Sequence, residues 1–475
     1  MLEKRDFYIN GVWVSPATAH DCAVIDPSTE DQCAVISLGA QADTDAAVAA
    51  ARAAFDGWSQ TSKADRAALL TKLLEIYTTR GEEMAQAISL EMGAPIEMAR
   101  AQQVGAGSWH LQGFLKAFES FEFERDYTAS EKTLLEPVGV CALITPWNWP
   151  MNQIVLKVVP ALATGCTMVL KPSEVAPLSA HLFAEFMHEA GFPAGVFNLV
   201  NGDGAGVGSQ LSAHPDVDMV SFTGSTRAGI AISKAAADTL KRVSLELGGK
   251  GANIIFEDAH PDAVKAGATR CFGNTGQSCN APTRMLVHKS RYDDAVAMAA
   301  ETANATAVRP ASDAGRHMGP LVSQAQYDKV QALIEVGITE GRLVAGGLGR
   351  PDGLERGFFV KPTVIADVTN DMTIAREEVF GPVLSIIPFD TEEEAIAIAN
   401  DTPYGLTNYI QTQDDATRRR VARRLRSGMV ATNGQGFALG SPFGGYKQSG
   451  NGREGGTFGL EEFLEVKAVS GWAIE

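Results

Sequence analysis

The fold is decided by a series of short apolar runs: VGVCALIT at residues 138–145, TMVLK at 167–171, VFNLV at 196–200, DMVSF at 218–222 and RVSLEL at 242–247. Amphipathic segments that we expect to be helices separate them, from about Met151 to Ala163, over 178–190 and after Ser225. Continuous Val, Ile and Leu runs that alternate with helices are typical of a parallel sheet covered on both faces. The sequence therefore predicts an open, doubly wound α/β domain.

A second alternating series follows the first. Its predicted strands are ANIIF at 252–256, TRMLVH at 283–288, PVLSIIPF at 382–389 and GMVAT at 428–432, with helices around 261–271, from Arg291 and from Thr391. Residues 43–103 are Ala-rich and helical in pattern. Two α/β units in one chain favour a ligand site in the cleft between them, near the carboxyl ends of the strands.

Two segments alternate apolar and polar residues with period two. They are Phe121 to Glu124 together with Thr133 to Leu135, and Phe463 to Lys467. This period is typical of two-faced antiparallel strands, which tend to add to a neighbouring sheet. We therefore expect these strands to contact a partner subunit.

Composition excludes several classes of protein. The 475 residues are 45% hydrophobic, enough for two to four domains and too apolar for a disordered chain. Forty basic against 57 acidic side chains give a net charge of −17, which argues against nucleic acid as a partner. The arginine-rich stretch 418–426 follows Asp414 and Asp415, so we expect a solvated helix face paired with acids.

Membrane and metal chemistry are not predicted. The N-terminus lacks the apolar core of a signal peptide, and the uncharged stretch 137–156 contains three prolines that interrupt a spanning helix. These features predict a cytoplasmic protein with no membrane contact. The six cysteines form no CxxC pair and no regular spacing, so neither a disulfide framework nor a metal site is expected.

Several enzyme motifs are absent. His188-Glu189 is followed by Phe192 where HExxH needs its second histidine, and Ile230 stands where a Walker A lysine belongs. No GxSxG occurs. The single GxGxxG, at 450–455, has no βαβ unit after it and is interpreted as a chance match.

One cysteine lies in an unusual context. Cys279 is in the Gly-rich, polar stretch 273–280 just before a predicted strand, whereas Cys141 and Cys166 lie in apolar runs. A partly exposed thiol with nearby donors can act as a thiolate nucleophile. From context alone, a nucleophile and a buried loop cysteine are equally supported.

Glu246 and Asn148 each allow two interpretations. Glu246 lies at an apolar strand end, where a carboxylate either pairs with a cation such as Lys250 or has the raised pKa of a general base. Asn148, in WNWP at 147–150, either donates its amide to an oxyanion or closes a turn before the proline.

Polar turns also follow other predicted strands. KPSE at 171–174 either recognises a ribose or caps a helix, and FTGST at 222–226 opens a helix whose backbone N–H groups favour a phosphate. Three such strand ends in a row indicate one extended ligand.

Together these residues resemble the aldehyde dehydrogenase superfamily over essentially the whole chain. The motifs that carry the resemblance occur in the family's order: PWNWP at 146–150, KPSE at 171–174, FTGS at 222–225, LELGGK at 245–250, GQSC at 276–279, EEVFGP at 377–382 and SPFGG at 441–445. In combination and in order they are highly specific.

The resemblance implies roles for individual residues. Cys279 would be the nucleophile that forms a thiohemiacetal and then a thioester, and Asn148 with the Cys279 backbone N–H would form the oxyanion hole. Glu246 would activate the water that hydrolyses the thioester. For the cofactor, it implies Lys171 and Glu174 at the adenosine ribose, Gly224, Ser225 and Trp147 at the pyrophosphate, Glu378 at the nicotinamide ribose and Phe380 beside the ring. Because Glu174 opposes a 2′-phosphate, NAD is expected, with NADP possible through Lys171.

The family's architecture implies three units. These are a cofactor-binding domain (1–118 and 138–247), a catalytic domain (248–453) and a β-strand oligomerisation flap (119–137 and 454–475). The flap implies a homodimer or homotetramer.

The resemblance also places residues along the substrate channel: Trp109, Gln153, Leu156, Ser278, Asn280, Phe437 and Phe443. The set is mostly apolar and aromatic, and contains no arginine to bind a second carboxylate. A medium-length aliphatic or aromatic aldehyde is therefore expected. The alternatives are a CoA-acylating semialdehyde dehydrogenase, which Glu246 disfavours because such relatives generally lack this acid, and a catalytically silent protein that retains the fold.

Overall fold

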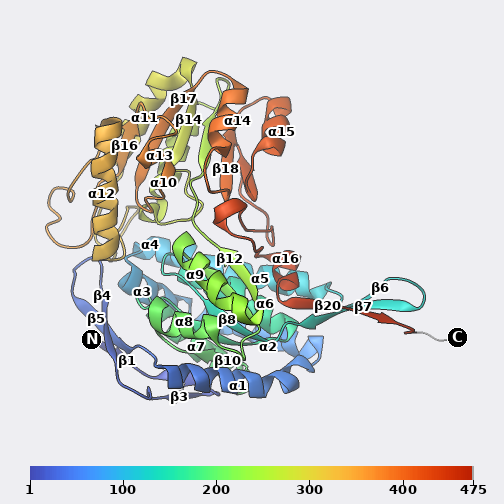
Figure 1. The fold of residues 1–475 in the computed structure, drawn as a ribbon. Helices are drawn as coiled ribbons and strands as arrows, with labels where there is room; N and C mark the ends of the chain where they lie inside the picture. Colours follow the sequence, from blue (N-terminus) through green and yellow to red (C-terminus); the bar gives the residue numbers. More distant parts are fainter. Residues whose placement is uncertain (473–475) are drawn as a thin grey trace.

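The computed structural model describes residues 1–472 and divides into two stacked lobes with a projecting arm (Figure 1). Residues 473–475, the end of the predicted flap, lie outside the described residues. The lower lobe is built on a seven-stranded sheet in the order β12 (Arg242–Glu246), β11 (Met219–Thr223), β8 (Val140–Ile144), β9 (Thr167–Lys171), β10 (Phe197–Leu199), β2 (Phe7–Ile9) and β3 (Val12–Val14). The first five strands are parallel, while β2 and β3 pair antiparallel.

Helices surround this sheet. They are α1 (Gln41–Ser59), α2 (Lys63–Thr79), α3 (Gly81–Met92), α4 (Ile96–Met98), the π-helix η1 (Ala99–Val104), α5 (Gly105–Glu119), α6 (Pro150–Thr164), α7 (Leu178–Ala190), η2 (Gly204–Gly208), α8 (Ser209–Ala213), α9 (Thr226–Ala236) and η3 (Ala237–Thr239). The predicted alternation of strands and helices is confirmed here to within one or two residues at most boundaries. A three-stranded sheet that the sequence reasoning missed precedes them: β1 (Leu2–Lys4), β5 (Gln32–Ser37) and β4 (Asp21–Ile25).

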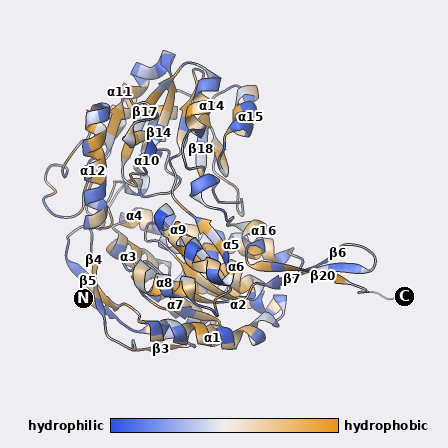
Figure 2. Cartoon of the chain, viewed as in Figure 1, coloured by the Kyte–Doolittle hydropathy of each residue, from blue (hydrophilic) through white to orange (hydrophobic). Residues whose placement is uncertain are grey.

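The upper lobe holds a second seven-stranded sheet. Its order is β15 (Arg342–Ala345), β16 (Thr363–Ala366), β17 (Val383–Phe389), β14 (Arg284–His288), β13 (Ala252–Ile255), β18 (Thr407–Gln411) and β19 (Met429–Thr432), parallel except for β15. Its helices are α10 (Ala263–Phe272), η4 (Gly273–Gly276), η5 (Lys289–Arg291), α11 (Tyr292–Ala305), α12 (Gln324–Glu340), α13 (Thr373–Arg376), α14 (Glu392–Asn400) and α15 (Asp415–Arg424). Each lobe has its own apolar core, and Figure 2 shows the strands as mainly hydrophobic and α15 as strongly hydrophilic.

The arm is an antiparallel sheet of β20 (Leu464–Ser470), β7 (Glu131–Pro137) and β6 (Glu124–Asp126), preceded by η6 (Lys447–Ser449) and α16 (Gly456–Glu461). The prediction of a strand over 121–124 is wrong for its first three residues. The Phe121 and Phe123 rings pack against each other with centroids 5.0 Å apart, and Phe123 also contacts Phe118 on α5. Residues 121–123 are therefore held by ring packing, and β6 begins only at Glu124.

The arginine-rich stretch forms α15, as expected, and Asp414 caps its N-terminus. Arg420 and Arg424 pair with Glu392 and Glu393 of α14, in addition to the Arg418–Asp415 pair. Within residues 1–472, no helix is both long and apolar enough to cross a membrane.

Candidate active site

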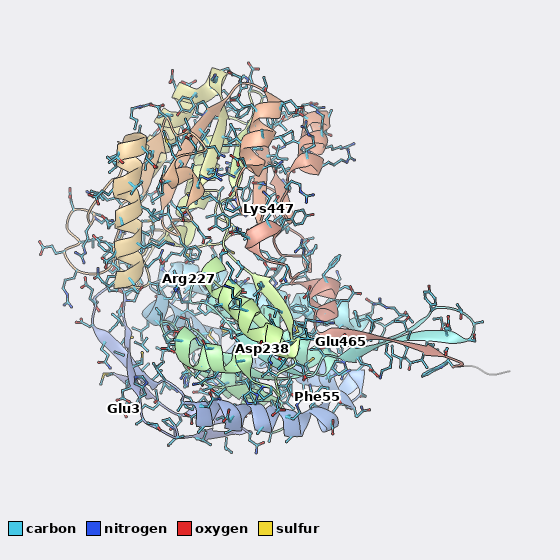
Figure 3. All side chains as sticks on the ribbon, viewed as in Figure 1. Glu3, Phe55, Arg227, Asp238, Lys447 and Glu465 are labelled. Carbon is cyan, nitrogen blue, oxygen red and sulfur yellow. The ribbon has the colours of Figure 1, made fainter. Side chains whose placement is uncertain are left out.

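The predicted catalytic residues meet in a cavity between the two lobes. Asn148, Glu246 and Cys279 all line it, together with Trp147, Gly224, Ser225, Glu378 and Phe380 from the predicted cofactor set. Asn148 follows the carboxyl end of β8, Ser225 follows that of β11, and Glu246 is the last residue of β12. Cys279 comes from the loop before β14. Figure 3 labels Arg227, on α9 where the lower lobe faces the upper.

Cys279 follows a turn whose backbone is held in an uncommon conformation. Asn274, Thr275 and Gly276 have φ values of 52°, 57° and 69°, and left-handed geometry costs roughly 1–2 kcal/mol for each residue with a Cβ. Gly276 has no alternative, because a Cβ there would lie 2.1 Å from Gly381. The turn therefore needs support from its surroundings.

Side-chain hydrogen bonds to the backbone provide that support. Thr275 Oγ1 donates to the Gly319 carbonyl at 3.0 Å, and Gln277 Oε1 accepts from the Val322 N–H at 3.0 Å. Because both groups are buried, each bond holds the turn against the loop at 319–322.

Asn148 is fixed to the same turn. Its Nδ2 donates to the Gln277 carbonyl at 3.1 Å, and its own carbonyl accepts from Asn274 Nδ2 at 3.0 Å. A second donor, Gln103 Nε2 on the π-helix η1, reaches that carbonyl at 3.0 Å and Asn274 Oδ1 at 3.3 Å. An amide nitrogen has two N–H groups, so Asn148 retains one for another acceptor. Gln103 was missed from the sequence, because an isolated polar residue in a helical run gives no signal. Asn274 lies in the polar stretch 273–280, from which only Cys279, Ser278 and Asn280 were singled out.

Glu246 is buried at the end of β12, and neither of its carboxylate oxygens has a hydrogen-bond partner among the described residues. Burial raises its pKa well above the ordinary value, and the nearby charge of Glu454 raises it further. The alternative pairing with Lys250 is not seen, since the Lys250 Nζ also has no partner within residues 1–472. Gly444 permits the chain to pass close by, because a Cβ there would lie 2.7 Å from Glu246 Oε1.

A buried ion pair lies beside Glu246. Lys157 Nζ on α6 and Glu454 Oε1 are 2.5 Å apart, and both charges act on Glu246. The pair was missed from the sequence, although a single lysine within the apolar run 151–163 was a usable signal.

The Cys279 thiol is partly exposed to the cavity. Burial raises its pKa well above the ordinary value, with further increases from Glu378 and Glu246. The thiol is therefore neutral near pH 7, and it needs a base to accept its proton as the sulfur attacks.

The cavity fits a dinucleotide. Ser225 caps α9, with its Oγ accepting from Ala228 N–H at 3.3 Å, so the helix N-terminus opens toward the cavity and favours a phosphate. Gly248 leaves room for Glu378, whose Oε1 accepts from Gly249 N–H at 2.8 Å. The Trp147 and Phe380 rings meet edge-on, with centroids 5.4 Å apart.

Lys171 and Glu174 lie at the end of β9, with Nζ and Oε2 3.4 Å apart. The helix-cap alternative for KPSE is wrong, because α7 begins only at Leu178 and its N-terminus is capped by Glu91 of α3.

The predicted channel residues are distributed differently. Gln153 and Leu156 are buried on α6, Trp109 and Phe437 are exposed, and Phe443 is half-buried. Ser278 and Asn280 line a second cavity of about 750 Å³ on the other side of the nucleophile loop, together with Trp149, Tyr409, Arg270 and Arg316. Arginines therefore border this cavity, although none was in the set predicted from the resemblance. Among residues 1–472, no cluster of side chains is suited to a metal ion.

A thiol, an amide and a buried carboxylate without a partner among residues 1–472 therefore line one cavity. The sequence model of the aldehyde dehydrogenase family matches residues 13–469. A 3-succinoylsemialdehyde-pyridine dehydrogenase from a Pseudomonas species is 53% identical, with 99% of each chain covered.

Similar solved structures are also aldehyde dehydrogenases. A crystal structure of an aldehyde dehydrogenase from Bartonella henselae is 59% identical, with a TM-score of 0.99 and coverage of 99% of this chain and 100% of that one. A mutant of aldehyde dehydrogenase C from Pseudomonas syringae, solved with NAD+ and octanal, is 51% identical, with a TM-score of 0.98 and coverage of 99% and 97%. The chain belongs to the aldehyde dehydrogenase family. It is an NAD(P)-dependent enzyme that oxidises aldehydes, and its α/β fold is the one expected.

Proposed function

We propose that this enzyme oxidises an aldehyde to the free carboxylic acid through a thioester on Cys279. The observation that carries the proposal is that Cys279, Asn148 and Glu246 line one cavity. NAD is the cofactor, as it is in several solved relatives. When bound, NAD accepts the hydride that leaves the aldehyde carbon.

The protein's own groups account for the other steps. The Cys279 thiol gives its proton to a water molecule in the cavity as the sulfur bonds to the carbonyl carbon. The resulting oxyanion accepts hydrogen bonds from Asn148 Nδ2 and the Cys279 backbone N–H. Loss of hydride leaves a thioester. Glu246 then takes a proton from water, which attacks the thioester carbon and releases the thiolate and the acid. The Lys157–Glu454 pair beside Glu246 offers a route by which this proton leaves.

The cofactor residues fit the same scheme. Ser225, Gly224 and Trp147 hold the pyrophosphate at the start of α9, Glu378 the nicotinamide ribose, and Phe380 lies beside the ring. Lys171 and Glu174 hold the adenosine ribose. The Glu174 carboxylate repels a 2′-phosphate, so the ratio of kcat/KM for NAD to that for NADP is expected to exceed ten and to fall in Glu174→Gln.

The body of the substrate is proposed to be aliphatic or aromatic. The apolar residues predicted along the channel support this, as do two relatives above, one solved with octanal and one named for a pyridine-bearing semialdehyde. NADH formation across an aldehyde panel, with and without CoA, tests the proposal. Turnover that requires CoA would instead identify an acylating enzyme, and absence of turnover would identify a silent protein. Preference for succinic semialdehyde over every apolar aldehyde would overturn the substrate class.

The arm is proposed to join subunits of a homodimer or homotetramer. It projects away from both lobes (Figure 1), and Val466 on β20 is 71% exposed, which is unusual for an apolar side chain on a strand. Glu465, labelled in Figure 3, pairs with Arg242 at 2.8 Å where the arm leaves the lower lobe, which fixes the direction of the arm.

A further inference from the structure

The second cavity beside the nucleophile loop is lined by two arginines. Arg270 at the end of α10 and Arg316 are both exposed and line it. Within residues 1–472, no carboxylate lies within ion-pair distance of either guanidinium, whereas Arg420 and Arg424 each have a glutamate partner. The histidine and the carboxylate that line the cavity are His260 and Asp262, whose Nδ1 and Oδ2 atoms lie 3.8 Å apart.

The position of Arg270 is tied to the nucleophile loop. Its guanidinium lies over the ring of the buried Tyr409, 4.6 Å from the centroid. The Tyr409 hydroxyl donates to the Asn280 carbonyl at 2.5 Å, and Asn280 directly follows Cys279. Stacking of a planar guanidinium on an aromatic ring restricts its orientation, so its outward N–H groups are held ready for a ligand.

Stacking on Tyr409 leaves the hydrogen-bonding groups of this arginine available. The fully buried Arg284 shows what a structural role requires, because its guanidinium donates to Asn370, to the carbonyls of Ile398 and Ala399, and to the Lys250 carbonyl. Arg270 instead presents its charge to a cavity that Trp149, Ser278 and Asn280 also line, with Trp149 Nε1 donating to Ser278 Oγ at 2.9 Å.

We propose that Arg270 and Arg316 form a distal subsite for a carboxylate at the far end of the aldehyde substrate. The inference rests on the proposed function, because it takes this cavity as the approach to Cys279. Both arginines are exposed and line this cavity, whereas Cys279 lines the neighbouring one, so the carboxylate they bind must be separated from the reacting carbonyl by a chain. The preferred class of substrate is therefore an ω-oxo carboxylic acid with an apolar middle. Its apolar chain would contact the channel, and its carboxylate would bind the two arginines.

The test compares octanal with 8-oxooctanoate, which differ by the terminal carboxylate. We expect the wild-type enzyme to show the higher kcat/KM for 8-oxooctanoate, and the ratio of the two kcat/KM values to fall about tenfold in Arg270→Gln and also in Arg316→Gln, as expected for loss of a charged hydrogen bond. Arg270→Lys keeps the charge but loses the planar group that stacks on Tyr409, so its ratio of kcat/KM values should lie between those of the wild type and Arg270→Gln. Raised ionic strength should weaken turnover of the acid alone.

Arg419→Gln on α15 is the matched control, and neither substrate should be affected. An unchanged ratio in Arg270→Gln and Arg316→Gln, or an equal loss for both substrates, would overturn the subsite while continued octanal oxidation keeps the proposed function. Absence of NADH formation from every aldehyde would instead overturn the proposed function, and the subsite with it.

Discussion

Burial raises the pKa of both Glu246 and Cys279, with a different consequence for each proposed role. A neutral thiol avoids placing a thiolate beside three carboxylates, while an acid with a raised pKa is a stronger base once ionised. The two residues differ in position, because Glu246 ends a buried strand whereas Cys279 lies on a loop that lines the cavity.

Replacing Glu246 by glutamine should leave acylation of Cys279 intact and slow hydrolysis of the thioester. We expect a burst of NADH near one per subunit, followed by steady-state turnover about 10²- to 10⁴-fold slower than in the wild type, the usual contribution of a general base. Stopped-flow absorbance measures both phases. If the burst is lost while the steady state is unchanged, Glu246 is not the hydrolytic base.

Steady-state turnover is expected to decrease at low pH. Glu246 must be ionised to act as a base, and burial raises its pKa, so steady-state turnover should fall as the pH drops through that raised pKa. Turnover measured from pH 5 to 9 should show this acidic limb in the wild type but not in Glu246→Gln. The same limb in both enzymes would assign it to another group.

Gln103 is expected to position Asn148 and the nucleophile turn. Gln103→Leu removes a donor from two buried acceptors, at a cost of about 1–3 kcal/mol. We expect kcat to fall at least tenfold with little change in KM, and Gln103→Glu, which keeps the shape without the N–H, to show the same loss. Gln86→Leu on the exposed face of α3 is the control. Unchanged kcat in both Gln103 variants would contradict this role.

At the scale of elements, the strands and helices between residues 138 and 288 were predicted well because their apolar periodicities are strong. The strands β2, β3, β16 and β18 and the helix α12 were not among the predicted elements. The errors have local physical causes. Phe121 and Phe123 alternate like a strand but pack into the core, and the edge strand β15 is too short and exposed to give a pattern. The π-helix η1 could not be predicted, because hydrophobic period does not distinguish it from an α-helix.

Glu91 links two elements and should make stability depend on pH. It caps α7 by accepting from the Leu178 and Ser179 N–H groups, and burial raises its pKa to about 7 from an ordinary value of 4.5. Because the folded pKa is the higher, ionisation of this buried carboxyl destabilises the fold, although the two N–H groups favour the charged form. The stability is full below about pH 4.5, and about 3 kcal/mol is lost as the pH rises through 7.

Urea unfolding at pH 5 and pH 8 measures this effect. The loss of unfolding free energy between these pH values should be smaller in Glu91→Gln than in the wild type by up to about 3 kcal/mol. Equal losses in the two proteins would show that Glu91 does not ionise in this range.

At the scale of the whole molecule, the sequence predicted two α/β units and a ligand site between them, but not how the lobes face each other. The motifs located Cys279, Asn148 and Glu246 through the family resemblance. The second cavity could not be found this way, because Tyr409 is far in sequence from Arg270 and Asn280 and meets them only when α10 packs on the sheet that contains β13 and β18.

Assembly is tested on the arm. Val466→Lys places a charge on an exposed apolar position of β20, and it should shift the protein toward monomers with its circular dichroism unchanged. Light scattering after size exclusion measures the mass. A wild-type protein that is monomeric at working concentrations would refute the role proposed for the arm, and an unchanged mass in Val466→Lys would show that this position is not part of the contact.

The thioester on Cys279 can be observed directly by mass spectrometry of the Glu246→Gln protein incubated with NAD and octanal. The account predicts one octanoyl group per subunit, located on the peptide that contains Cys279, and none when NAD is omitted or when Cys279 is also replaced by alanine. NADH formation without any acyl group on Cys279 would contradict it.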